Sequence, residues 1–378
     1  MSSGRILIAY NAPQREQRGR DIDFVSEAGV FDQVNAVHGA LVELGYEVAV
    51  VPLQKSVSTF IERITRFRPD AVFNLVEGWQ GDSRFHMHFP GLYELLGCEY
   101  TGAPNSAMVM TFDKWMTKML LNQAHLPVPR GMMCSEVPGR CRLRYPLIVK
   151  PAHEDASLGI DADSVVYNLD DLRRRVAWVI QNYHQPAIVE EYIDGRELNV
   201  AVIGDQIPEV LPISEITFAG VPEGQPRICS YNVKWMEDSP EFHWVGAECP
   251  ALLDEQTTLR IHKIALAAFR LLGCRDYARV DMRLARDKQP YIVEVNANPD
   301  LSPDAGLTRS ALASGRSYTQ LVGEITALAL RRGESHDDSR PAAGRSPAYR
   351  ADSNSNGPVH ADRSGSRARV DRHLPQPA

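Results

Sequence analysis

Long apolar runs, paired cysteines and an excess of positive charge are all missing from this sequence. No segment approaches the roughly 18 consecutive apolar residues that a membrane-spanning helix needs, so we expect no membrane segment. The six cysteines include no CxxC pair, which argues against a zinc site or a disulfide framework and favours free thiols. The formal net charge of -7 gives no indication of nucleic-acid binding.

The first residues, MSSGRILIAYNAP, lack the positively charged segment and the apolar stretch of a signal peptide, and we therefore expect a cytoplasmic protein. The chain has 378 residues, which is enough for two or three domains that each bury a core.

Strands and helices alternate over the first hundred residues. Short apolar runs predict strands over 5–10, 46–52 and 71–76. Apolar residues at helical spacing over 34–44 predict a helix between the first two strands. This alternation is typical of a parallel α/β unit.

Farther along, helices are predicted over 111–124, 170–183, 257–272 and 318–330, and strands over 146–151, 187–193 and 197–203. The turn signal Asp194-Gly195 joins the last two of these strands. The segment from 333 to 378 is rich in Ser, Pro, Arg, Asp and Gly and has almost no large apolar residues. It cannot bury enough surface to offset its ordering entropy, so we expect it to be disordered.

The strongest local signal is a predicted β-hairpin, ARVDMRLARDKQPYIVEVNANPD, at 278–300. With Asp287-Lys288 as a two-residue turn, opposed positions follow from the alternation of side chains along a strand. Two cross-strand pairs then share one face: Asp281 with Glu294, and Arg279 with Asn296. The other face is apolar and carries Val280, Met282 and Leu284 against Tyr291, Val293 and Val295.

The charged face of this hairpin has a chemical use. Carboxylate and amide oxygens bind magnesium, which leaves part of its coordination shell to water and phosphates. An arginine beside them can stabilise negative charge that develops during a reaction. The alternative is a solvated hairpin face on which an arginine and an aspartate form an ordinary ion pair.

Several motifs in order resemble the ATP-grasp ligases, and the most similar branch is that of the D-alanine–D-alanine ligases. The resemblance covers roughly residues 5 to 330, and its motifs are specific in combination. They are LLGCEYTGAPNSAMVMTFDKWMTKMLL (95–121), VKPAHEDASLG (149–159), VEEYIDGRELNVAVIG (189–204), RVDMR (279–283) and VEVNANPD (293–300).

The resemblance implies an α/β (α+β) protein with the ATP-grasp fold, in which two α+β subdomains sandwich ATP behind an amino-terminal parallel α/β domain. The implied domains are 1–105 (amino-terminal), 106–186 (central), 187–332 (carboxy-terminal, with the metal site) and 333–378 (tail).

Site residues also follow from the resemblance. Lys114 and Lys150 would reach the phosphates of ATP, and Arg279 would face the reacting acyl phosphate. The other implied ATP-binding residues are Ser157, Gly159, Glu190, Glu191, Tyr192, Ile193 and Glu197. Asp281, Glu294 and Asn296 would bind two Mg²⁺ ions, for which Mn²⁺ can substitute; Lys234 would approach the γ-phosphate; Glu27, Asp300 and Asp304 would contact substrate.

The implied activity is an ATP-dependent carboxylate–amine ligase that forms a peptide or amide bond through an acyl phosphate. Its partners would be a small carboxylate and a small amine, and the resemblance also implies a homodimer. One alternative is a true D-alanine–D-alanine ligase of cell-wall synthesis. Another is a non-catalytic ATP-binding regulatory protein, although the retained lysines and metal ligands argue against a decayed site.

Four positions depart from the D-alanine–D-alanine ligase pattern. Ala156 and Trp235 stand where that family has a serine and a tyrosine, and Asp300 and Asp304 lie in the region that binds the acceptor. Two aspartates would repel the carboxylate of an acceptor and attract an ammonium group. We therefore expect a ligase of this type whose acceptor differs from D-alanine.

Overall fold

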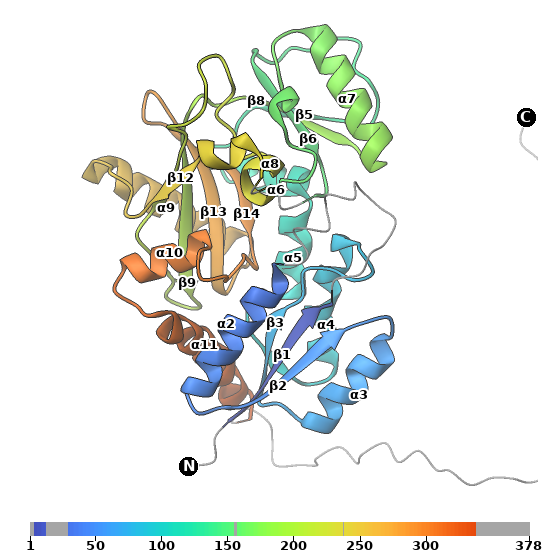
Figure 1. Cartoon of the computed structure of the whole chain (residues 1–378), viewed down its shortest axis with the longest axis vertical. Helices are drawn as coiled ribbons and strands as arrows, with labels where there is room; N and C mark the ends of the chain where they lie inside the picture. The colour runs from blue at the N-terminus through green and yellow to red at the C-terminus, as the bar shows by residue number, and fades with distance from the viewer. Residues whose placement is uncertain (1–3, 13–28, 155–156, 237, 338–378) are drawn as a thin grey trace, which may run out of the picture. The chain divides into compact units, whose positions relative to one another are not determined.

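Three β-sheets organise the chain (Figure 1). The computed structural model describes residues 4–12, 29–154, 157–236 and 238–337. All of them belong to one unit that ends at Asp337.

The first sheet is parallel throughout, in the order β2-β1-β3-β4, as predicted for this region. Ile6 and Ile8 of β1 pack toward α2 and α11, whereas Leu7 and Ala9 pack toward α3. Burial on both faces explains the continuous apolar run in β1. The elements are β1 (Arg5–Asn11), α2 (Val30–Glu43), β2 (Glu47–Leu53), α3 (Val57–Phe67), β3 (Ala71–Leu75), η2 (Ser83–Met87), α4 (His88–Leu95) and β4 (Glu99–Tyr100).

The second sheet is antiparallel, in the order β5-β8-β6-β7. Helix α7 covers one face, and its Leu172 and Val176 share a core with Val149 and Val189. Asn168 caps the first turn of this helix with its side chain. The elements are β5 (Gly131–Cys134), β6 (Leu147–Pro151), η3 (Ala162–Ser164), β7 (Val165–Val166), α7 (Leu169–Tyr183) and β8 (Ala187–Glu191).

The third sheet has the order β12-β11-β9-β13-β14, with β10 paired to β9. Val280 and Met282 of β13 pack with Ile261 and Ala265 of α9 on one face. The elements are β9 (Gly195–Gly204), β10 (Glu209–Val210), β11 (Ser214–Thr217), α8 (Tyr231–Trp235), η4 (Pro240–Trp244), β12 (Gly246–Glu248), α9 (Glu255–Leu271), β13 (Asp276–Ala285) and β14 (Pro290–Asn296).

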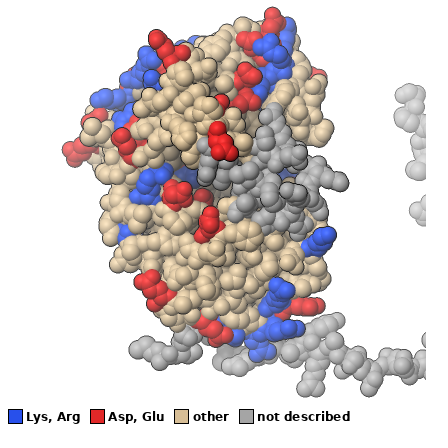
Figure 2. Space-filling model, viewed as in Figure 1, with Lys and Arg blue, Asp and Glu red and all other residues tan. Residues whose placement is uncertain are grey.

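Among the described residues, α5 (Asn105–Phe112) and α6 (Lys114–Gln123) lie between the first and second sheets, and α10 (Gly306–Ala313) and α11 (Tyr318–Asp337) follow the third sheet. Within the described ranges, no helix has the length and apolar character that crossing a membrane requires. Acidic and basic side chains are interspersed on the face drawn in Figure 2, without a continuous basic surface.

Three local predictions need correction. The helix expected over 111–124 is two helices, because Asp113 ends α5 and its carboxylate caps α6 by accepting from the amide of Met116. The strands around Asp194-Gly195 belong to different sheets and form no hairpin. Helix α11 runs to Asp337, into the segment predicted to be disordered, and the rest of that segment lies outside the described residues.

The domain limits drawn from the sequence remain a proposal. The pairing of β8 with β5 and β6 favours a boundary between the second and third sheets after Glu191, a few residues beyond the predicted one. Helix α11, near the carboxy-terminal end of the described chain, packs beside α2 on the first sheet (Figure 1).

A buried ion pair ties the first sheet to the third. Asp276 opens β13 and is fully buried. Its carboxylate accepts from Arg332 of α11 at 3.0 Å and from the amide of Gly102 at 2.9 Å. Burial raises the pKa of Asp276, and Arg332 opposes that rise. Arg332 also donates to the carbonyl of Tyr100, two residues before Gly102, so one guanidinium joins α11, β4 and β13.

We expect Arg332→Ala to destabilise the fold by about 3–5 kcal/mol, because it leaves the Asp276 carboxylate buried without its cation. The midpoint of urea unfolding, followed by circular dichroism, measures the change. Arg286→Ala is the control, since Arg286 pairs with Asp194 on the surface and its loss should cost less than about 1 kcal/mol. Equal midpoints for the two variants would contradict the assigned role of Asp276.

Candidate functional site

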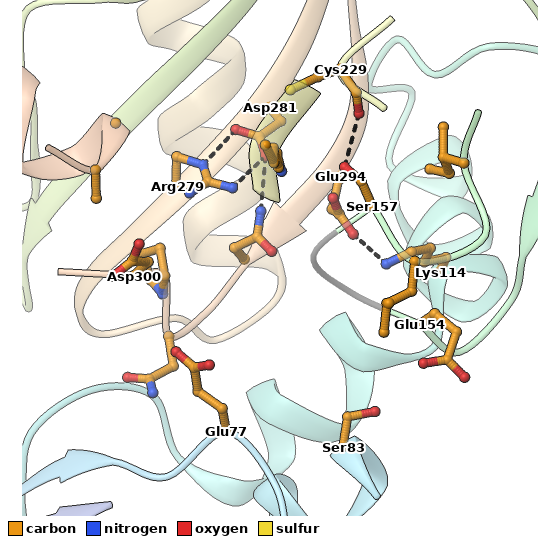
Figure 3. A pocket seen from close by; sticks show the side chains of 18 of the residues that line it. Glu77, Ser83, Lys114, Glu154, Ser157, Cys229, Arg279, Asp281, Glu294 and Asp300 are labelled. Atoms are coloured by element: carbon orange, nitrogen blue, oxygen red, sulfur yellow. Dashed lines mark hydrogen bonds and ion pairs between the residues drawn. The ribbon is translucent and has the colours of Figure 1, made fainter. Parts of the chain in front are cut away.

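A cavity of about 1320 Å³ lies where side chains from all three sheets meet (Figure 3). This volume exceeds the roughly 300–1,000 Å³ of common small-molecule sites, so the cavity has room for more than one ligand. Every predicted site residue lines it except Gly159 and Glu27. Glu27 and Ala156 lie outside the described residues, as does the side chain of Trp235.

The β13–β14 hairpin forms one wall of the cavity. The predicted opposition of Asp281 to Glu294 and of Arg279 to Asn296 is confirmed. The predicted two-residue turn is wrong, because the amide of Ala285 donates to the carbonyl of Gln289 at 3.0 Å and closes a three-residue loop. Lys288 has a φ of 63° there, as the last position of such loops requires.

A register shift after Asp281 compensates for the longer loop. On the side of Asp281 away from the loop, the predicted pairing of β13 with β14 therefore holds. Nearer the loop, Met282 lies opposite Ile292, so the core face carries Ile292 where Val293 had been expected. Val293 instead lines the cavity.

Asp281 is the most connected acceptor on this wall. Arg279 donates to both of its oxygens, at 2.7 and 2.9 Å, and Asn296 donates at 2.9 Å. Asn199 of β9, which lies opposite Asp281, adds a bond of 2.8 Å. Burial disfavours the charged form of Arg279, but Asp281, Glu294 and Asp300 outweigh it and raise the pKa of the guanidinium. Arg279 is therefore a permanent positive charge in the cavity wall.

Glu294 pairs with Lys114, the first residue of α6 (Figure 3). Burial alone would raise the pKa of Glu294. Lys114 and Lys150 outweigh it and hold the pKa of Glu294 at about 2, so this carboxylate is ionised at neutral pH.

A second carboxylate, Glu190 of β8, lies between two lysines. Its Oε2 lies 2.7 Å from Lys150 Nζ, and its Oε1 lies 2.6 Å from Lys118 Nζ. Burial opposes ionisation of Glu190, but Lys150 and Lys118 together lower its pKa. The side chain of Glu190 is thus occupied by protein partners, and no motif in the sequence indicates that Lys118 is one of them.

Arg283 of β13 contacts the segment that follows β8 and the neighbouring strand β9. Its Nη1 lies 2.8 Å from Glu197, and its Nε donates to the carbonyl of Ile193 at 3.1 Å. Sequence reasoning assigned Arg283 no role, although alternation along β13 puts it on the same face as Arg279 and Asp281. Asn199 is harder to find, because it reaches Asp281 only through the long-range pairing of β9 with β13.

Two loops meet over the cavity. Ser157 donates to the carbonyl of Cys229 at 2.9 Å, and the amide of Tyr231 donates to the carbonyl of Ile160 at 3.0 Å. Lys234 lines the cavity from α8, which follows this contact. Gly159 shapes the first loop: it has a φ of 72°, and a Cβ there would lie 2.8 Å from a side-chain carbon of Pro151.

The end of the cavity toward the first sheet is acidic. Glu77, Asp300 and Asp304 line the cavity there, and the first two are labelled in Figure 3. Asp300 is oriented by Ser302, whose amide and hydroxyl donate to it at 2.8 and 2.7 Å. Arg309 of α10 donates to the carbonyl of Asp304 at 2.8 Å.

The predicted metal ligands fit a magnesium site only in part. Within the described ranges, no group of three or more His, Cys, Asp and Glu side chains is suited to hold a metal ion. Asp281, Glu294 and Asn296 nevertheless offer two carboxylates and an amide on one face. Oxygen ligands of this kind suit Mg²⁺ when phosphates and water complete its shell.

The chain is similar in sequence to known proteins over most of its length. The sequence profile described as "D-ala D-ala ligase C-terminus" matches residues 122–327. An uncharacterised protein of Sinorhizobium fredii is 36% identical over 79% of this chain and 87% of its own length. A D-alanine–D-alanine ligase of Alcanivorax borkumensis is 34% identical over 79% of this chain and 88% of its own.

Among solved structures, the chain is similar in fold to a D-alanine–D-alanine ligase from Bacillus anthracis complexed with ATP. The TM-score is 0.70 at 23% identity, and the match covers 89% of this chain and 100% of that one.

The Lys114–Glu294 pair predicts a pH-dependent stability. Because the folded-state pKa of Glu294 is lowered from its ordinary value, the pair stabilises the fold above that ordinary value, and this contribution is lost as the pH falls toward about 2. In Lys114→Met the pKa of Glu294 should rise, since the positive charge that counteracts the effect of burial has been removed. We expect a lower urea midpoint than wild type at pH 7 and a difference that shrinks between pH 7 and pH 3.

The exposed Lys55 provides the control for this measurement, since Lys55→Met should match the wild type at every pH. A difference between Lys114→Met and wild type that stays constant over the whole range would rule out the pairing as its cause.

Proposed function

The chain belongs to the D-alanine–D-alanine ligase family, and we propose on that premise that its cavity binds ATP, a carboxylate and an amine together and joins the last two. Its fold is the ATP-grasp fold of the α/β class, and its activity is that of an ATP-dependent carboxylate–amine ligase. One observation carries the proposal for this cavity: the face of β13–β14 bearing Arg279, Asp281 and Glu294 lies beside Lys114 and Lys150.

ATP would lie between the second and third sheets. Lys114, Lys150 and Lys234 would contact its phosphates, since a lysine is a flexible point charge for such groups. The adenine would lie against the segment Glu191–Ile193, and the ribose near Glu197. The amides of Glu191 and Tyr192 already donate to the carbonyls of Arg130 and Pro146, so other groups of the segment must read the base.

Asp281, Glu294 and Asn296 would hold two Mg²⁺ ions, as the family resemblance implies, and Mn²⁺ could substitute for them. The bound ions would neutralise charge on the phosphates. Asn199 and Arg279 hold Asp281 in position from two sides, so the chain presents this carboxylate in a fixed orientation.

The reaction has two steps. An oxygen of the donor carboxylate attacks the γ-phosphorus, the bond to the bridging oxygen of ADP breaks, and an acyl phosphate forms. The amine then attacks the acyl carbon, its proton leaves, and phosphate departs. Arg279 stabilises the negative charge of the tetrahedral intermediate. The loop that carries Ser157 covers the phosphates and excludes water, which would otherwise hydrolyse the acyl phosphate.

The acceptor is proposed to be an amine that carries a further positive charge. Asp300 and Asp304 line the cavity, where Arg279 is already paired with Asp281 and Arg309 offsets one of the two negative charges, so the remaining charge would disfavour a second carboxylate. The names of several relatives support D-alanine as the competing acceptor. A homodimer and a cytoplasmic location, where ATP is abundant, complete the proposal, and size-exclusion chromatography tests the first of these.

ADP release over a panel of donors and acceptors tests the ligase. We expect amine-dependent ADP release, with diamines and basic amino acids more effective than D-alanine. Best stimulation by D-alanine would make the chain a true D-alanine–D-alanine ligase. If ATP binds and no amine stimulates ADP release, the non-catalytic alternative is correct.

Asp281→Ala should lower turnover at least about 100-fold, since a metal ligand contributes several kcal/mol of charge stabilisation. The Mg²⁺ concentration for half-maximal activity should rise as well. Asp287→Ala, in the exposed loop of the same hairpin, should behave as wild type. Unchanged turnover in Asp281→Ala would refute the metal assignment.

A further inference from the structure

Lys118 lies one helical turn after Lys114 on α6, and the two lysines form ion pairs with residues of different sheets. Lys114 pairs with Glu294 on the third sheet, whereas Lys118 pairs with Glu190 on the second. Residues four apart share one face of a helix, so α6 presents both ammonium groups in the same direction. Helix α6 therefore joins two sheets that flank the cavity.

Lys118 does not line the main cavity but a small second pocket, which it shares with Lys114, Lys150 and Glu190. It is 7% exposed and is not among the described residues that line the main space. Its ammonium group is held by the carbonyl of Pro129 at 2.6 Å and by Glu190 at 2.6 Å. Lys150 and Glu190, in contrast, both line the cavity. The ammonium group of Lys118 is therefore held by protein groups and acts on the main cavity through Glu190.

The charges of Lys150, Glu190 and Lys118 together decide how strongly Lys150 attracts an anionic ligand. With Glu190 alone, Lys150 would form a neutral pair, and its attraction for an anion would be largely cancelled. Lys118 adds a second cation to the same carboxylate, so the three groups carry one net positive charge. Burial strengthens this effect, because charges interact more strongly away from water.

We propose that Lys118 is a positioning residue that balances Glu190 from behind and so leaves the Lys150 ammonium group available to the phosphates of ATP. The inference rests on the proposed contact of Lys150 with those phosphates. It also gives the Glu190 carboxylate a role of its own, which is to hold Lys118 and Lys150.

Binding of ATP and of adenosine to the full chain, measured by isothermal titration calorimetry, tests the proposal. Lys118→Gln should weaken ATP binding about tenfold, the scale of one charge-assisted hydrogen bond, and leave adenosine binding within about twofold. The reason is that adenosine has no phosphates for Lys150 to contact. In turnover, the KM for ATP should rise while kcat changes little, whereas a merely structural defect would lower the active fraction and leave KM unchanged.

The double variant Lys118→Gln/Glu190→Gln separates charge from packing. It removes one positive and one negative charge, so Lys150 again carries the net positive charge, and ATP affinity should return to within about threefold of wild type. It also buries no unbalanced carboxylate, which keeps the test usable if Lys118→Gln folds poorly. Lys263→Gln, on the exposed side of α9, is the control and should bind both ligands as wild type.

Three results would overturn the inference. These are equal weakening of ATP and adenosine by Lys118→Gln, no weakening of either, and no recovery in the double variant. Lys150→Gln distinguishes this failure from a failure of the proposed function. If that variant binds ATP normally, the phosphate contact itself is wrong; if it binds ATP weakly while Lys118→Gln does not, only the role of Lys118 is wrong.

Discussion

The position of β13 between β9 and β14 is the constraint on which the cavity depends. Because side chains alternate along a strand, this register puts Arg279, Asp281 and Arg283 on one face. The neighbouring strands then bring Asn199 and Glu294 beside them. A slip by one residue would turn these charges into the core, so the buried apolar face of the same strand secures the geometry of the site.

Charged groups around the cavity are buried in compensating sets. Glu294 forms an ion pair with Lys114, Asp281 with Arg279, and Glu190 with Lys118 and Lys150. A buried charge without a partner would be costly, and each set therefore limits which side chain can move. Two of these sets, those of Glu294 and Glu190, join residues from different elements, so the same ion pairs that keep the site charged also fix the second and third sheets around it.

The acidic end of the cavity, which carries Asp300 and Asp304, is positioned differently. Asp300 and Asp304 lie on the irregular segment after β14, where no strand pairing dictates their direction. Ser302 and Arg309 orient this segment through short-range hydrogen bonds. A substitution in this segment can therefore change the charge at this end of the cavity without disturbing the strand pairing of β13 with β14.

The sequence alone determined the parallel first sheet and the pairing of Asp281 with Glu294, because periodicity and hairpin geometry act over short distances. The wrong turn did no harm, since the shift after Asp281 restored the register at the site. Only the tertiary structure decided that Asn199 supports Asp281 and that Lys118 balances Glu190. Those contacts join elements far apart in the chain, and no local pattern encodes which distant charge will complete a buried set.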